Sequence, residues 1–189
     1  MMGTLSQKSI RVRGFSMPEV LLSMFVLSVG LMTIVAVMAG SLSSSYETRD
    51  AIVATGLALE GVEIVRNIRD NNMADGDDGF NVPTGGVYCR VDWNDPSDIT
   101  NFCNNDPNWQ TRYNLQFLGG RYTHINNTQE RYARWLHLEV GGDAIDSWAI
   151  VTSYVIWDFS AGTFPDTPTE CSVMKNCVYM ETFLTSWRP

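Results

Sequence analysis

The sequence has few basic residues for its number of acidic ones, and this shortage excludes one large class of function. Its 13 Lys+Arg are outnumbered by 21 Asp+Glu, which gives a formal net charge of −8. Neutralising nucleic-acid phosphates takes clustered Lys and Arg, so the composition argues against a nucleic-acid partner. With 11% aromatic residues and six Trp, the chain is also unlike a disordered protein. Its 189 residues suffice for one domain, or for one domain with an appendage.

Catalytic and metal-binding motifs are missing as well. The chain has no Gly-x-Ser-x-Gly and no Gly-rich phosphate loop. His124 and His137 are its only histidines, and neither lies near a cysteine pair in the sequence. We therefore expect both histidines to be strand or surface residues and not catalytic bases or metal ligands. Asp75, Asp77 and Asp78 lack the spacing of an EF-hand loop. The sequence therefore predicts no enzyme, no metal site and no cofactor.

Charge is absent from one long stretch near the N-terminus. The 23 residues from Val20 to Leu42 include no charged side chain, and 17 of them are apolar. At ~1.5 Å per residue such a helix is roughly 34 Å long, enough to cross a hydrocarbon core of ~30 Å. The residues before it carry three positive charges and no acid: Lys8, Arg11 and Arg13.

The positive-inside rule keeps this basic end in the cytoplasm. We therefore expect a single-pass protein of the cytoplasmic (inner) membrane, with its C-terminal body outside the cytoplasm. That body, residues 43–189, holds 20 acidic and 10 basic residues. An exported body with an even number of cysteines favours disulfides. Four cysteines allow three pairings, of which we take sequence neighbours first: Cys89 with Cys103, and Cys171 with Cys177.

A single acidic residue, Glu19, lies at the start of the apolar stretch. A carboxylate at membrane depth costs ~2.5–3.5 kcal/mol on insertion scales, so it needs a partner. A cut between Gly14 and Phe15 would place the new α-amine of Phe15 one helical turn from Glu19. Such an ion pair, within one chain or between neighbouring chains, is favoured in a low dielectric and would set the register between subunits. Pro18 fits the first turn of a helix.

The segment Gly14-Phe15-Ser16-Met17-Pro18-Glu19, followed by the apolar run, resembles the signal of type IV prepilins. The resemblance implies that a prepilin peptidase cuts after Gly14 and N-methylates Phe15, and that Glu19 sets the assembly register. The rod is similar to those of minor pilins and pseudopilins, although it lacks the mid-rod Pro of many major pilins. The family implies a structural subunit of a type IV pilus-like or type II secretion-like filament. Its partners would be other pilins, contacted through helix packing, and its final location a cell-surface or periplasmic filament.

Beyond the rod, the pattern predicts an α+β fold in which the long N-terminal helix, transmembrane and then amphipathic, packs on an antiparallel β-sheet. Side chains at helical spacing predict a core face, and Arg66 is placed to pair with Glu63 and Asp70. The core face consists of Ala54, Leu57, Ala58, Gly61, Ile64, Val65 and Ile68. The predicted strands, from alternating or β-rich runs, are 87–93, 113–117, 134–140, 148–157 and 178–184. The predicted segments are a leader at 1–14, a transmembrane half-helix at 15–45, an amphipathic half-helix at 46–71 and a β-rich body at 72–189, with loops at 71–86, 94–111 and 158–177.

Other interpretations stay open at this point. A conventional signal cleaved after Val37-Met38-Ala39 would release a soluble protein, and an uncleaved anchor would leave Glu19 unexplained. The body could be a membrane-anchored or tip-located adhesin or binding module, with Trp93, Trp109 and Trp135 as a ligand platform, or a tethered enzyme. The sequence does not choose between pilus, secretion and competence machines.

Overall fold

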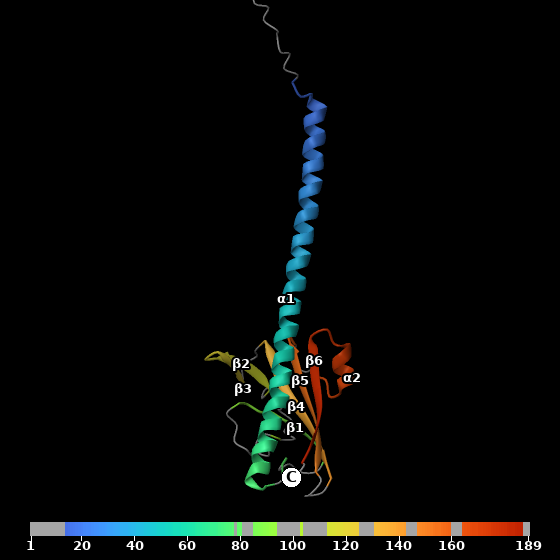
Figure 1. Ribbon diagram of the computed structural model, residues 1–189. Helices are drawn as coiled ribbons and strands as arrows, with labels where there is room; N and C mark the ends of the chain where they lie inside the picture. The colour runs from blue at the N-terminus through green and yellow to red at the C-terminus, as the bar shows by residue number, and fades with distance from the viewer. Residues whose placement is uncertain are drawn as a thin grey trace, which may run out of the picture. The chain divides into compact units, whose positions relative to one another are not determined.

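The computed structural model describes residues 14–77, 79–80, 85–93, 103, 113–124, 131–142, 147–159 and 164–186. The expected α+β class is confirmed, with a long N-terminal helix and an antiparallel sheet (Figure 1). The elements are α1 (Met17–Asp75), β1 (Gly85–Cys89), β2 (Asn114–Leu118), β3 (Arg121–His124), β4 (Tyr132–Gly141), β5 (Trp148–Trp157), α2 (Pro168–Val173) and β6 (Cys177–Thr185). The chain divides into two compact units, Met1–Tyr46 and Glu47–Pro189, which are taken in turn.

In the first unit, α1 begins directly before the uncharged run. The Ser16 carbonyl accepts hydrogen bonds from the amides of Glu19 and Val20, at 3.0 and 3.3 Å. Pro18 lies in this first turn, where its missing N–H leaves no hydrogen bond unmade. The helix continues without interruption through Gly40. The basic leader residues Lys8, Arg11 and Arg13 lie outside the described residues.

In the second unit, α1 lies against one face of the sheet. The predicted core face is confirmed, except that Ile64 is only half-buried and Val62 joins the buried set. Gly61 lies where a Cβ would come within 2.6 Å of Ser153 Oγ, so the missing side chain lets the helix approach β5 closely. The predicted pair between Arg66 and Asp70 is wrong: Arg66 pairs with Glu63 at 2.5 Å, and Asp70 with Arg69 at 2.6 Å.

The helix also ends later than predicted, at Asp75 instead of Asn71. Asn72 is buried, and its side-chain amide donates to the carbonyl of Gly79 at 3.3 Å, which ties the last turn to the following segment. Gly76, at φ 85°, then ends the helix in a left-handed conformation that favours glycine.

The sheet order is β3-β2-β4-β5-β6, and β1 also pairs with β4. All pairings are antiparallel, and β1 and β2 take different parts of β4. Strand β5 has the predicted bounds, whereas β1 stops at Cys89 instead of continuing to residue 93. Strand β3 was not predicted; it follows a two-residue turn of Gly119 and Gly120, both with positive φ.

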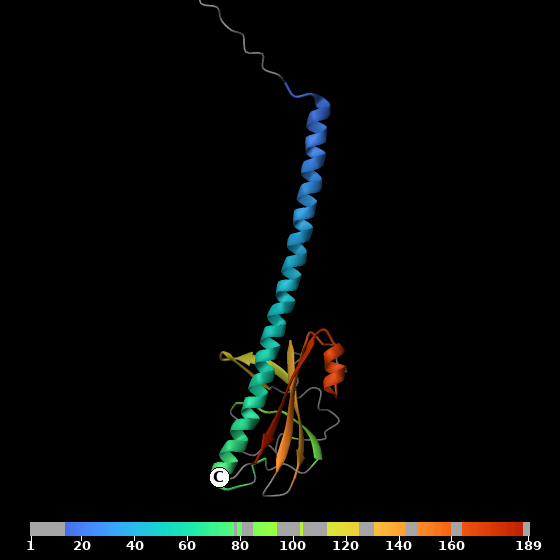
Figure 2. The ribbon, with the colours of Figure 1, turned by 45° about the vertical axis from the view of Figure 1, so that its right-hand side comes forward.

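Opposite faces of the sheet are covered by different elements (Figure 2). The α1-facing side holds two apolar clusters, which include Leu57 and Val65 of the helix and Leu136 and Val155 of the sheet. The other side holds an aromatic cluster in which Trp135 stacks on Tyr154, covered by Cys171 of α2 and its neighbours. Helix α2 lies inside the predicted loop 158–177 and is a further correction.

Two disulfides are present, and they join the sequence neighbours expected to pair. Cys89 at the end of β1 is bonded to Cys103, and Cys171 of α2 to Cys177 at the start of β6. The second bridge closes a short loop that fixes α2 to the sheet. In the chain-entropy model, loops of this size stabilise by about 2–3 kcal/mol each.

Candidate functional site

The Gly14–Glu19 junction is exposed and leads into the helix. Gly14 and Phe15 precede α1 and are not helical, and Phe15 is 81% exposed. A Cβ on Gly14 would meet no atom within 4 Å. Glu19 lies in the first turn and is also exposed. The described residues of this junction are therefore exposed, and Glu19 follows them within the first helical turn.

The apolar residues that follow are exposed in the same way. Every residue from Gly14 to Arg49 is exposed, including Leu22 at 65% and Val37 at 72%. Soluble proteins rarely expose apolar surface of this extent, so the surface needs an apolar environment. The helix is long and apolar enough to cross a membrane.

Three hydroxyl groups in the uncharged run are bonded within the helix. Ser23 donates to the carbonyl of Val20 and Thr33 to that of Gly30, both at 2.8 Å, and Ser28 donates to Met24. Such bonds to the preceding turn satisfy a hydroxyl without a partner from outside. These three side chains therefore add little to the cost of placing the helix in lipid.

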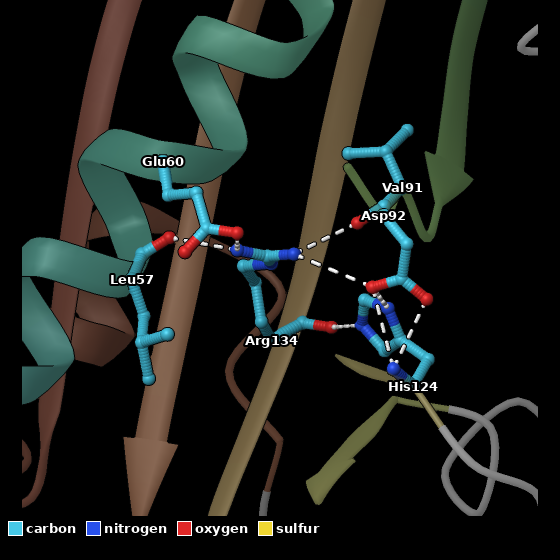
Figure 3. Close-up of polar contacts among 6 residues, drawn as sticks. All are labelled: Leu57, Glu60, Val91, Asp92, His124 and Arg134. Atoms are coloured by element: carbon cyan, nitrogen blue, oxygen red, sulfur yellow. Dashed lines mark hydrogen bonds and ion pairs between the residues drawn. The ribbon is translucent and has the colours of Figure 1, made fainter. Parts of the chain in front are cut away.

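In the body, a buried polar cluster joins α1 to the sheet around Arg134 of β4 (Figure 3). The Arg134 side chain is fully buried. Its Nη1 donates to the carbonyl of Leu57 at 3.2 Å and lies 3.5 Å from Glu60 Oε1, both on α1. On the other side, Nη2 donates to the carbonyl of Val91 at 2.8 Å and lies 3.7 Å from Asp92 Oδ1. One guanidinium thus bridges α1, β4 and the segment after β1.

His124, at the end of β3, completes this cluster. Its Nδ1 lies 2.8 Å from Asp92 Oδ1 and its Nε2 lies 3.0 Å from the Arg134 carbonyl oxygen. Burial acts to raise the pKa of Asp92, but the hydrogen bonds and charge of His124, with the charge of Arg134, outweigh it and hold the pKa below its usual value. The arrangement is an ion network that links α1 to β4, to the end of β3 and to the segment after β1.

A second polar contact anchors α1 where it enters the body. Asp50 is buried and accepts hydrogen bonds from Arg131 and from the Tyr132 hydroxyl, the latter at 2.8 Å. Burial and this hydrogen bond raise the pKa of Tyr132 to about 12. Asp50 therefore fixes the start of the buried part of α1 to the start of β4.

The remaining candidate residues do not come together. His137 lies in β4, half-buried against Tyr88, and Trp135 is buried while Trp93 is 54% exposed. Trp109 and Asp78 lie outside the described residues. Among the residues that the structure describes, no group of three or more His, Cys, Asp or Glu is placed to hold a metal ion.

Sequence reasoning missed the Arg134 cluster, although one signal was present. Arg134 has the same parity as Leu136, Leu138 and Val140, so strand alternation places it on the core face. A charged residue in phase with a core face requires buried partners. Those partners, Asp92 and His124, are brought in by tertiary contacts that sequence spacing does not reveal.

Comparison with protein-family models, with curated proteins and with solved structures found no match for this chain.

Proposed function

We propose that this protein is a structural subunit, a minor pilin or pseudopilin, of a type IV pilus-like or type II secretion-like filament. A prepilin peptidase cuts it between Gly14 and Phe15 and N-methylates Phe15, and it assembles through α1. One observation carries the proposal: an exposed, non-helical Gly-Phe junction leads into an exposed apolar helix whose first turn holds one carboxylate, Glu19.

The exposed apolar helix supports assembly because its surface has two suitable environments. Before assembly it lies in lipid, and after extraction it packs against the same helices of neighbouring subunits. Exchanging lipid contacts for helix contacts leaves the apolar surface away from water in both states. The helix can therefore leave the membrane without exposing this surface.

Glu19 supports a defined register in the packed state. After the cut, the amine of Phe15 is the one cation expected near Glu19 at this depth. An unpaired carboxylate is costly in low dielectric, so neighbouring helices settle where amine and carboxylate meet. The proposal assigns the protein a role in assembly instead of catalysis, first in the cytoplasmic membrane and then in the filament. The two disulfides suit a body on the oxidising side of that membrane.

The processing step is tested by the mass of the N-terminal peptide from protein purified out of the native cell. We expect a peptide that begins at methylated Phe15. A peptide that begins at Gly40 would instead mean a secreted protein, and one that begins at Met1 or Met2 an uncleaved anchor. Either result would overturn the proposed processing.

The assembly step is tested by Glu19→Ala. We expect the variant to insert in the membrane at the normal level but to be recovered in sheared filament fractions at a small fraction of the normal amount. Glu63→Ala is the control, because it removes an exposed carboxylate of the same helix, which pairs with Arg66. If Glu19→Ala were incorporated into filaments at the normal level, Glu19 would not set the register between subunits.

A further inference from the structure

A cleft of about 490 Å³ lies in the body where α1 meets the end of β5 and the turn before β6. Its volume is in the range of small-molecule sites. The residues that form it, all within the Glu47–Pro189 unit, include Glu47 and Ala51 of α1, Trp157 and Asp158, and Lys175 and Asn176.

The cleft wall opposite α1 is held by hydrogen bonds between its two segments. The Trp157 amide donates to the Asn176 carbonyl at 3.1 Å, and the Asn176 side chain donates back to the Trp157 carbonyl at 2.5 Å. The Asp158 amide donates to the Arg131 carbonyl at 3.1 Å. Asp158 has φ 52°, a left-handed conformation uncommon for a residue with a side chain. The side chains on this wall are therefore presented by a fixed backbone.

The cleft combines both signs of charge with an aromatic surface. Glu47 and Asp158 supply two carboxylates, and Lys175 supplies one ammonium. Arg131 lies near enough to Asp158 for their charges to interact, but it donates its hydrogen bond to Asp50. Trp157 is the buried member, 7% exposed, and an indole face attracts cations. Two carboxylates and an indole suit a ligand ammonium, and Lys175 suits an anionic group.

We infer that this cleft binds a small zwitterion of the phosphoethanolamine type. Its ammonium lies against Glu47, Asp158 and Trp157, and its phosphate lies against Lys175. The headgroup of phosphatidylethanolamine and free phosphoethanolamine share this chemistry.

The position of the cleft along the chain favours the lipid as the source. The uncharged run ends at Leu42, and Glu47 follows five residues later. Five residues span at most ~18 Å, so Glu47 is tethered close to the headgroup layer of any bilayer that the run crosses. The inference requires the helix to lie in a membrane, but it requires neither the cut at Gly14 nor filament assembly.

Lys175 offers a selective probe, because the only other lysine in the chain is Lys8. Reductive ¹³C-methylation keeps the charge of lysine and gives each side chain its own NMR signal. We would record these signals from the full chain in nanodiscs of phosphatidylglycerol alone and of phosphatidylglycerol mixed with phosphatidylethanolamine. In a second arm, soluble phosphoethanolamine is titrated into the first sample.

We expect the Lys175 signal to differ between the two lipid compositions. Glu47→Gln and Asp158→Asn should each remove this difference, and should weaken binding roughly tenfold through the loss of a charge-assisted contact. Asn also tolerates the left-handed conformation at position 158, so the turn is kept. The control Glu139→Gln neutralises an exposed carboxylate of β4 away from the cleft and should leave the difference unchanged.

A response to soluble phosphoethanolamine but not to the lipid would support the site and assign it to a free zwitterion. No Lys175 response in either arm would overturn the inference. A response that persists in both Glu47→Gln and Asp158→Asn would overturn it as well. The mass of the N-terminal peptide is independent of all these outcomes, so failure here is distinguishable from failure of the proposed processing.

Discussion

The two parts of α1 use apolar residues in opposite ways. From Gly14 to Arg49 every residue is exposed, whereas from Asp50 onward one face of the helix is buried on the sheet. Leu22 is 65% exposed and Leu57 is 4% exposed, although both are leucines of one continuous helix. Apolar side chains in the second part stabilise the body itself. Those in the first part are not buried by any other part of the chain that the structure describes, so their role depends on what surrounds the helix.

The largest expected change in unfolding free energy comes from Arg134→Met, which acts on the buried part of α1 and not on its exposed part. Removing the guanidinium takes away the buried cation that lies near Asp92 and Glu60 and that donates a hydrogen bond to the carbonyl of Leu57. Breaking a buried ion network in this way costs about 3–5 kcal/mol of unfolding free energy. Urea unfolding of the full chain in detergent micelles measures it. The control Arg66→Met removes only an exposed pair and should cost about 0.5 kcal/mol or less. Equal stability of the two variants would show that the cluster does not hold α1 on the sheet.

A matched pair of leucine substitutions tests the comparison directly. Leu57→Ala should destabilise the body by about 3 kcal/mol, because it removes buried methyl groups and leaves a cavity. Leu22→Ala should change the unfolding free energy of the body by no more than about 0.5 kcal/mol. The same urea experiment measures both variants. A large effect of Leu22→Ala on the body would mean that the two parts of α1 are not energetically separate.

The smallest expected effect is a pH dependence of the unfolding free energy. It comes from Asp92 in the Arg134 cluster, which holds the buried part of α1 on the sheet. The pKa of Asp92 is lower in the folded protein than its usual value, so its contribution is present above about pH 4 and is lost as pH falls through the folded pKa. The unfolding free energy, measured by urea titration between about pH 2 and pH 6, should therefore fall with pH. In Asp92→Asn this fall should be shallower. An unchanged slope would mean that Asp92 is not charged in the folded cluster.

Sequence reasoning predicted the elements that carry a long, regular pattern. The buried face of α1 follows from helical periodicity, and the ten residues of β5 follow from an unbroken run rich in Val, Ile, Tyr and Thr. Strand β3 has only four residues, Arg121 to His124, too few for alternation to be visible. Helix α2 is also short, and its start was marked by Thr167, whose side chain accepts from the Glu170 amide, followed by Pro168.

The three candidate sites differ in the same respect. The Gly14–Glu19 junction is local in sequence, so its residues were found from spacing. The Arg134 cluster joins residues from four segments, and the cleft at Trp157 joins three. Contacts of this kind depend on strand order and register, which the pattern of one strand does not determine.

The internal hydrogen bonds of Ser23, Ser28 and Thr33 have a mechanical consequence. Because these hydroxyls already donate to carbonyls of their own helix, they do not require a hydrogen-bond partner from another helix. Contacts between apolar side chains also have little directional preference. The hydrogen bonds of these three hydroxyls therefore set no preferred rotation of the helix relative to what surrounds it.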